Sequence, residues 1–367
     1  MKIIFSGGGT AGHVSPAIAM AQIISERYPD AEFIFVGRQD GDENRAITRR
    51  GYQLETLDVE GLSRKLGIKS AVALFKAGRA LIQACTLIKR YAPDMVIGTG
   101  GYVSWPILRA ASGMKIPTLI HESNAYPGLV TRMMAGRCSA VMLGFAEAAE
   151  HLNRPRRVFV TGNPVTSDFS TSPKHEARVK LGITDSEMLI ISFGGSLGAE
   201  VLNESIAGAM KKIASMRYRI THIHATGRRH YDDMCKSYPE LVKARGTRLV
   251  PYIEDMGLWM SAADLAITRS GAMTVAELDA AGLPAILIPS PNVTDDHQTK
   301  NAKAAVGSGR AMIIPEGELT SDRIANEIAS LYKFPERLER MRTSRVTGCS
   351  DRVKSLFLDA FNEIYKF

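Results

Sequence analysis

The stretch that most constrains the fold runs from Asp264 to Gln298. Residues 264–268 form a short apolar run, partly β-branched, which is typical of a buried parallel strand. Residues 269–271 break this run, residues 272–281 predict a helix, and residues 285–289 predict a second buried strand. A strand, a helix and a parallel strand make a βαβ unit. The chain is therefore expected to build an α/β sheet covered by helices.

The start of this predicted helix is a candidate phosphate site. Ser270 or Thr274 is placed to cap it. The free N–H groups and the positive end of the helix dipole suit a phosphate. Glu277 follows one turn later, where its carboxylate could accept hydrogen bonds from both hydroxyls of a ribose. Residues 295–298 are expected in a polar loop at the same sheet edge, where ligands of open α/β sheets bind. A purely structural glycine turn is the alternative.

Composition narrows the class of protein. With 367 residues, 45% of them hydrophobic, the chain can bury two cores, so two domains are expected. The four cysteines show no paired spacing, which argues against a disulfide framework or a zinc site and for a reducing cytoplasm. The net charge of +8 indicates anionic partners. No nucleic-acid motif is present, so a phosphorylated substrate or an anionic membrane surface is favoured over nucleic acid. No signal peptide or spanning helix is expected.

A second candidate site lies near the N-terminus. A predicted strand at residues 2–5 runs into the glycine loop 7–13, and a helix is expected from about Ser15 to Arg27 with Pro16 in its first turn. His13 ends the loop and could act as a general base, because the pKa of histidine is normally near neutral. A histidine bonded to nearby backbone is the alternative.

Both halves of the chain repeat the same alternation of strand, glycine loop and helix. Neither half carries a convincing dinucleotide fingerprint, which disfavours an oxidoreductase. We predict an α/β protein with two Rossmann-like, doubly wound domains whose glycine loops could face one cleft. The domains are expected at residues 1–163 and 164–345, followed by a C-terminal helix at 346–367 that could pack back on the N-terminal domain. Other strands are expected at residues 32–37, 95–98, 117–120, 141–143, 158–160, 188–193, 219–226 and 249–253, and residues 319–367 are expected to be helical.

Residues 64–90 combine apolar residues at helical spacing with clustered Lys and Arg. One interpretation is a helix packed on its sheet with a solvated basic side. The other is a peripheral contact with anionic lipid. The predicted apolar face comprises Ala71, Leu74, Phe75, Gly78, Leu81, Ile82, Cys85 and Ile88.

Seven short motifs in this order and spacing resemble the MurG family of bacterial glycosyltransferases. They are Gly7–His13, Gly100–Ser104, His121–Asn124, Gly162–Pro164, Gly194–Ser196, Arg269–Thr274 and His297–Ala302. This resemblance implies the GT-B architecture and inverting transfer of N-acetylglucosamine from UDP-N-acetylglucosamine to undecaprenyl-pyrophosphoryl-N-acetylmuramoyl-pentapeptide in peptidoglycan synthesis. It implies no cofactor and no strict need of a catalytic metal. The expected place of action is the cytoplasmic face of the cell membrane, as a peripheral protein.

The family's residue roles carry over where residues match. The N-terminal domain would bind the acceptor and its lipid, with His13 and Asn124 near the reaction centre and the loop residues Thr10, Ala11 and Gly12 touching substrate. The C-terminal domain would bind the nucleotide sugar. Its expected contacts are Ser196, Ala272, Met273 and Thr274 with the diphosphate, Glu277 with the ribose, the Ile253 backbone with the uracil, and His297 and Gln298 with the sugar hydroxyls.

Four positions depart from the family pattern. Ala11 stands where a further glycine is usual, which should restrict the loop backbone. Ser123 replaces a common glutamine, and Trp105 stands where a small residue is frequent. Thr166 lies where many members have an arginine, so one donor contact is expected to be missing or replaced.

A transfer reaction needs a base for the acceptor hydroxyl. His13 is the first candidate and Glu122 the reserve. Another GT-B glycolipid glycosyltransferase is one alternative, and two other classes of function also stay open. A sugar-nucleotide epimerase would turn over the donor without an acceptor, and a non-catalytic module would bind the nucleotide sugar and consume nothing.

Overall fold

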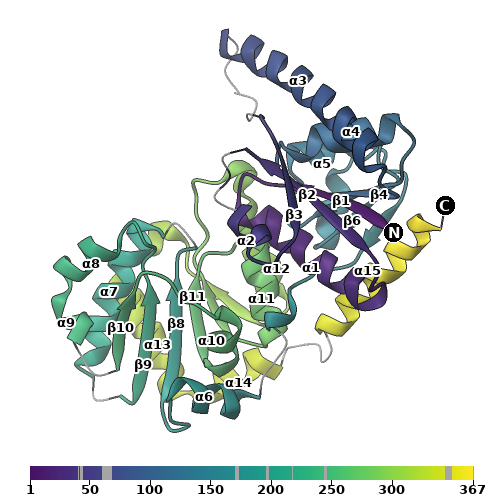
Figure 1. Ribbon diagram of the computed structural model, residues 1–367. Coiled ribbons are helices and arrows are strands. Elements are labelled where there is room, and N and C mark those ends of the chain that lie inside the picture. Colours follow the sequence, from purple (N-terminus) through teal and green to yellow (C-terminus); the bar gives the residue numbers. More distant parts are fainter. Residues whose placement is uncertain are drawn as a thin grey trace. The chain divides into compact units, whose positions relative to one another are not determined.

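The computed structural model describes residues 1–39, 41, 44–59, 68–169, 173–195, 198–216, 218–243, 246–343 and 349–366. The chain divides into two compact units (Figure 1). The first comprises Met1–Ser167 with Ser350–Phe367, and the second comprises Asp168–Cys349. The first unit thus extends slightly beyond the predicted limit at residue 163 and also takes in the last helix.

Within the described residues, the first unit has a seven-stranded sheet in the order β3-β2-β1-β4-β5-β6-β7, with all neighbours parallel. Parallel neighbours require crossover connections, and helices supply them here. The strands are β1 (Lys2–Gly7), β2 (Glu32–Arg38), β3 (Gln53–Leu57), β4 (Met95–Gly100), β5 (Thr118–Glu122), β6 (Ala140–Leu143) and β7 (Val158–Val160). The helices are α1 (Ala11–Arg27), α2 (Asn44–Thr48), α3 (Ile68–Tyr91), α4 (Ser104–Gly113), α5 (Leu129–Met134) and α15 (Cys349–Tyr365).

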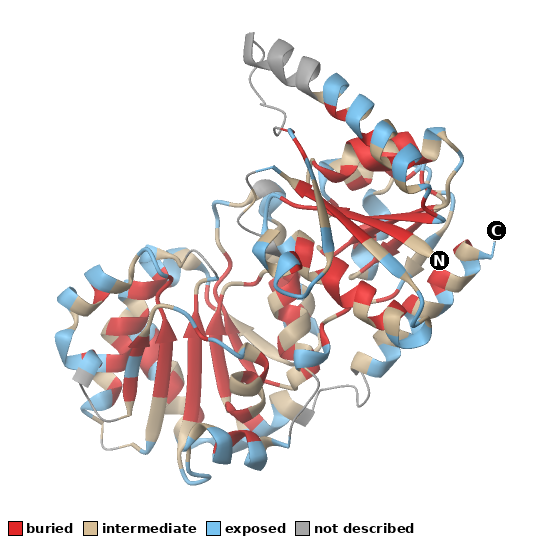
Figure 2. Ribbon diagram, viewed as in Figure 1, coloured by how far each residue is buried: buried red, intermediate tan, exposed pale blue. Residues whose placement is uncertain are grey.

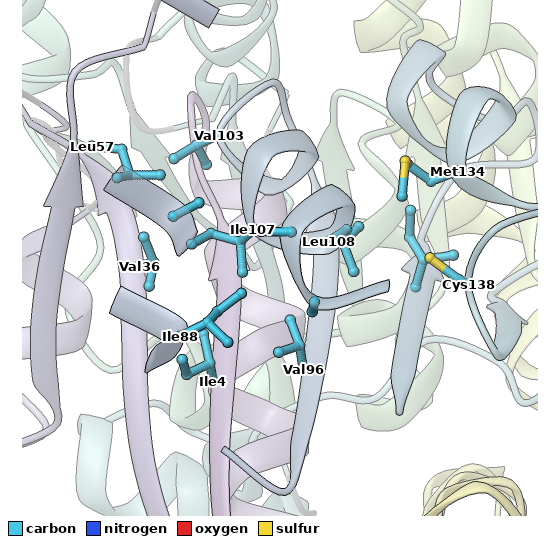
Figure 3. Close-up of a cluster of buried hydrophobic side chains, with 14 of the residues drawn as sticks. Ile4, Val36, Leu57, Ile88, Val96, Val103, Ile107, Leu108, Met134 and Cys138 are labelled. Atoms are coloured by element: carbon cyan, nitrogen blue, oxygen red, sulfur yellow. The ribbon is translucent and has the colours of Figure 1, made fainter. Parts of the chain in front are cut away.

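Successive side chains of each strand point to opposite faces of this sheet, so a hydrophobic core forms on each face. Ile4 faces a cluster that also includes residues of α3, α4 and α5, such as Ile88 and Leu108 (Figure 3). Its neighbours Ile3 and Phe5 face the other cluster, which takes in α1 and the α15 residue Phe361. The sheet is therefore covered on both sides, and its central strands β1, β4, β5 and β6 are buried almost throughout, whereas the edge strands β3 and β7 are mostly exposed or partly buried (Figure 2).

The second unit repeats this plan with a six-stranded parallel sheet among its described residues, in the order β10-β9-β8-β11-β12-β13. The two sheets thus share one doubly wound strand order, and the predicted fold class is confirmed. The strands are β8 (Met188–Phe193), β9 (Ile220–Ala225), β10 (Thr247–Val250), β11 (Leu265–Thr268), β12 (Ala285–Leu287) and β13 (Ala311–Ile313). The helices are α6 (Lys174–Leu181), α7 (Glu200–Ala214), α8 (Tyr231–Ser237), α9 (Pro239–Lys243), α10 (Met256–Ala262), α11 (Ala272–Ala281), α12 (His297–Gly307), α13 (Ser321–Lys333) and α14 (Pro335–Thr343).

Some expectations about individual elements were wrong. Helix α1 begins at Ala11, so Pro16 lies inside the helix and not in its first turn. In α3 the buried face includes Ala80 and Ala84, whereas Gly78 is exposed and the Ile82 side chain is 69% exposed. The side chains of residues 68–76, including three of the predicted apolar face, lie outside the described residues.

Two histidines of β9 are buried in the core of the second unit. His222 Nε2 and His224 Nδ1 lie 2.7 and 2.9 Å from the Ser192 hydroxyl, and His224 Nε2 lies 3.1 Å from Asn203 Oδ1. Burial lowers the pKa of His222 to about 3 and that of His224 to about 4. Both imidazoles are therefore neutral in the folded unit at neutral pH.

The buried pair predicts acid destabilisation. Below the ordinary histidine pKa of about 6.5, the unfolded chain binds protons that the folded unit does not. The free energy of unfolding should therefore fall as pH drops from about 6.5 to 4, by up to about 1.4 kcal/mol per pH unit for each histidine. Urea unfolding followed by Trp259 fluorescence in a Trp105→Phe background measures this slope. His224→Asn should show a smaller slope, and an unchanged slope would contradict the assignment.

Candidate functional site

The carboxyl edge of the first sheet is built by two βα turns in direct contact. A Cβ atom at Gly101 would lie 2.0 Å from the carbonyl oxygen of Gly8, so only glycine fits at this position. Gly100 and Gly101 also have positive φ values of 100° and 74°. A Cβ at Gly100 would lie 2.8 Å from His13 Cδ2. The glycine pair therefore forms the wall against which the imidazole of His13 lies.

The first turn of α1 fixes His13 and its tautomer. The Thr99 hydroxyl donates to the backbone oxygen of His13 at 2.7 Å, which ties α1 to β4. His13 Nδ1 lies 3.0 Å from the carbonyl oxygen of Gly8 and 3.2 Å from Thr10 Oγ1. Because a carbonyl oxygen can only accept, Nδ1 carries the proton in the neutral ring. Nε2 is then the basic nitrogen, which is the form that a general base requires.

Glu122 and Asn124 lie together at the end of the neighbouring strand β5. The Glu122 Oε1 atom accepts from the backbone N–H of Asn124 at 3.0 Å and from its side-chain Nδ2 at 3.1 Å. His121 and Glu122 are the last two residues of β5, so this strand ends two residues later than predicted. Burial lowers the pKa of His121 to about 4. Of this cluster, only Asn124 is part-exposed, so it is the member best placed to meet a ligand.

The other predicted residues of the first unit are placed as follows. Thr10 precedes α1, and Gly12 is exposed in its first turn. Ala11 is the first residue of α1, where alanine is favourable, so the expected restriction of a loop backbone does not apply. Thr166 is buried and lies in the first unit, and the expectation that a donor contact is missing or replaced there stays a prediction. Trp105 packs against the α3–α4 core as a partly buried side chain.

In the second unit, helix α11 follows strand β11 after a turn of three residues. Its N-cap is Gly271, and the helix has no side-chain capping hydrogen bond. The expectation that Ser270 or Thr274 caps it was therefore wrong. Ala272, Met273 and Thr274 occupy the first turn, whose N–H groups have no acceptor within a helix. The helix start is thus left to bind an anion.

Ser270 is engaged elsewhere because it joins α11 to α12. Its hydroxyl donates to the Gln298 backbone oxygen at 2.9 Å, and its own backbone oxygen accepts from Asn301 Nδ2 at 3.2 Å. The Gln298 side-chain oxygen accepts from the Ser290 N–H at 2.9 Å.

His297 and Gln298 are the first two residues of helix α12, and not the loop residues that we expected. Ser270 and Asn301 are fully buried. Both residues lie in motifs noted in the sequence, but their role in joining α11 to α12 was not predicted.

Glu277 lies in the second turn of α11 and is partly exposed. Burial raises the pKa of its carboxyl group to about 8. The group is therefore largely protonated at neutral pH in the unliganded unit and can both donate and accept a hydrogen bond. A carboxyl group with a raised pKa at a sheet edge is typical of a functional position.

Ile253 and Ser196 are the other two residues predicted to contact the nucleotide sugar. The Ile253 side chain is buried, and the residue lies between β10 and α10, so its backbone groups are not used by the sheet ladder. Ser196 lies outside the described residues. In the described part of the chain, no group of three or more His, Cys, Asp or Glu side chains could hold a metal ion.

Family models match most of the chain. Residues 3–143 match the glycosyltransferase family 28 N-terminal domain, and residues 189–356 match the family 28 C-terminal domain. These ranges cover the two sheets except for strand β7 and the first residue of β1 and of β8. The fold and its sites therefore define a glycosyltransferase with two Rossmann-like domains.

Relatives that match over nearly the full length show which family of glycosyltransferases the chain belongs to. The chain is 41% identical to the UDP-N-acetylglucosamine–N-acetylmuramyl-(pentapeptide) pyrophosphoryl-undecaprenol N-acetylglucosamine transferase of Acetivibrio thermocellus, over 98% of both chains. It is 40% identical to the protein of the same name from Carboxydothermus hydrogenoformans, over 93% of this chain and 91% of the relative. The chain belongs to the MurG family of N-acetylglucosaminyltransferases.

Solved structures agree with this placement. MurG from Acinetobacter baumannii superimposes with a TM-score of 0.73 at 27% identity, covering 98% of this chain and 99% of that chain. A UDP-N-acetylglucosamine 2-epimerase from Listeria monocytogenes, described as putative, superimposes with a TM-score of 0.72 at 14% identity, covering 99% and 97% of the two chains. The second likeness shows the fold alone.

The geometry of α11 predicts the effect of removing Glu277. Glu277→Ala should weaken binding of UDP-N-acetylglucosamine by roughly 1–3 kcal/mol, the loss of two neutral hydrogen bonds of about 0.5–1.5 kcal/mol each. Isothermal titration calorimetry measures the change. Glu240→Ala, which alters an exposed acid of the same unit, serves as the control. Unchanged donor affinity in a folded Glu277→Ala protein would remove Glu277 from the site.

Proposed function

We propose that this protein transfers N-acetylglucosamine from UDP-N-acetylglucosamine to the 4-hydroxyl of the N-acetylmuramoyl group of undecaprenyl-pyrophosphate-linked pentapeptide, with inversion. The observation that carries the proposal is the similarity, over nearly the full length, to relatives named for this transfer. The reaction belongs to peptidoglycan synthesis. An epimerase is not favoured, because the epimerase likeness rests on the fold alone.

The second unit is assigned to the donor. The uncapped start of α11 supplies N–H groups and the positive end of a helix dipole to the diphosphate of UDP. Glu277 accepts from the ribose hydroxyls, Ile253 meets the uracil through its backbone, and Gln298 meets the sugar. The same helix start stabilises the diphosphate as negative charge grows on it during departure.

The first unit is assigned to the acceptor. Nε2 of His13 removes the proton of the acceptor hydroxyl as that oxygen attacks the anomeric carbon of N-acetylglucosamine. The bond between this carbon and the β-phosphate oxygen breaks on the opposite side, and UDP leaves with the electron pair. This single displacement inverts the anomeric configuration. The fixed Nδ1–H tautomer supports this role for His13, because it leaves the basic nitrogen on the far side of the ring from Gly8.

The test is an assay of radiolabelled donor with and without a short-chain lipid acceptor. Label should enter lipid only when the acceptor is present, and His13→Ala should lower turnover by about 10²–10⁴-fold, as for loss of a general base. Donor affinity of the variant should stay near that of the wild type. Donor turnover without acceptor would point to an epimerase. Turnover of His13→Ala within a few-fold of wild type would leave His13 a structural role.

We further propose peripheral binding to an anionic membrane surface through the first unit. In the described part of the chain, no helix is long and apolar enough to cross a membrane. Ile82 of α3 and the α5 residues Leu129 and Met133 are 69%, 53% and 48% exposed, and α4 packs against both of these helices. Exposed basic side chains on α3, Arg79, Lys89 and Arg90, suit anionic head groups. Of the clustered basic residues predicted at 64–90, those before residue 77 have no described side chain.

The membrane proposal predicts a loss of vesicle binding on removing the exposed apolar side chains. Ile82→Gln, Leu129→Gln and Met133→Gln together should reduce sedimentation with anionic vesicles strongly, because each buried CH₂ contributes about 0.8 kcal/mol. Activity on a water-soluble acceptor should persist. The matched control is Val179→Gln with Val201→Gln, two exposed apolar residues of the second unit. Equal losses in both variants would contradict the proposal.

A further inference from the structure

The side chain of Glu122 is held by four donors at the end of β5. It is only 5% exposed. Its Oε1 atom accepts from both nitrogens of Asn124, and its Oε2 atom accepts from the Gly128 N–H at 2.8 Å and the Thr131 hydroxyl at 2.7 Å. A buried carboxylate is tolerated when hydrogen bonds replace the lost water, and these four bonds do so.

This arrangement leaves little capacity for base catalysis by Glu122. An ionised carboxylate offers about four lone-pair sites, and four protein donors occupy them. A general base must instead present a lone pair to the proton that it removes. Removing a substrate proton with Glu122 would first require breaking at least one of these bonds.

The four bonds close the segment from residue 123 to residue 128. Both Asn124 nitrogens are held at one end of the segment, and Gly128, the N-cap of α5, is held at the other. Because Nδ2 of Asn124 donates to the carboxylate, the amide oxygen must point away from Glu122. The orientation of the Asn124 side chain is thus set by a group that does not itself reach the surface.

Further contacts keep this segment rigid. Between its ends, the Tyr126 ring lies 4.6 Å from the His151 ring, and the Arg132 guanidinium donates to the Tyr126 hydroxyl at 3.2 Å. Behind the segment, Asn163 Nδ2 donates to the Ser123 carbonyl oxygen at 2.9 Å. The segment, α5 and the Gly162–Pro164 motif therefore hold one another in a single arrangement.

We propose that Glu122 is a positioning residue that orients Asn124 for the acceptor, and not the general base. The proposal rests on the proposed transferase function and assigns the contact with the acceptor to Asn124. Thr131 shares this role, because its hydroxyl is one of the four donors and is buried within α5. Thr131 therefore offers a way to disturb the arrangement while the carboxylate stays present.

The experiment compares Thr131→Val, Thr131→Ser and Glu122→Gln in the transfer assay, with KM measured separately for donor and lipid acceptor. Thr131→Val should raise the acceptor KM by about 5–20-fold, around the lower limit for loss of one charge-assisted hydrogen bond, because Thr131 acts on the acceptor only through Glu122 and Asn124. The donor KM and the pH profile of turnover should stay unchanged. Thr131→Ser, which keeps the hydroxyl, should return the acceptor KM to within about 2-fold of wild type. Glu122→Gln should raise the acceptor KM further and leave the pH profile in place.

Two results would overturn the proposal. One is a normal acceptor KM in Thr131→Val combined with loss of turnover and a changed pH profile in Glu122→Gln, the behaviour of a base. The other is a fall in kcat alone that matches the unfolded fraction measured by circular dichroism, the behaviour of a purely structural residue. Transfer by the wild-type protein in the same assay separates either failure from a failure of the proposed function.

Discussion

Close contact between backbones at the carboxyl edge of each sheet determines where the candidate residues lie. In the first unit, a Cβ at Gly101 would lie 2.0 Å from the Gly8 oxygen. In the second unit, a Cβ at Gly198 would lie 2.1 Å from the Thr226 oxygen. Neighbouring βα turns can approach this closely only where one of them is glycine. Because the turns touch, side chains that follow them, such as His13, are held by backbone groups rather than by long flexible contacts.

The two units carry different groups at the carboxyl edges of their sheets. The first unit carries His13 after β1 and the hydrogen-bonded pair Glu122 and Asn124 at the end of β5, and it fixes each side chain by hydrogen bonds. The second offers the uncapped start of α11, with Glu277 one turn further along. A transferase needs both, since one substrate must lose a proton while the other loses a diphosphate. Under the proposed function, one strand order, built twice, would supply a base in the first unit and an anion site in the second.

Much of the fold could be predicted, because it depends on short apolar strands and glycine turns. The bounds of α11 and β8 match the prediction. Errors arose where tertiary contacts override local preference. Ser270 has the residue type of a cap, but its hydroxyl is used by α12. Strand β13 has only three partly buried residues and was missed. One of the four hydrogen bonds that occupy the Glu122 carboxylate comes from Thr131, nine positions away. No local sequence pattern could therefore have shown whether Glu122 is a positioning residue or a general base.

The central claim, that the two strand-end sites bind different substrates, is tested most directly by hydrogen–deuterium exchange with UDP-N-acetylglucosamine alone. Amides of the α11 start and of the neighbouring α12 start should gain protection, because the donor's diphosphate and sugar would accept their hydrogen bonds. Amides of the first glycine loop should exchange at the rate seen without donor. Protection confined to that loop, with α11 unchanged, would contradict the account.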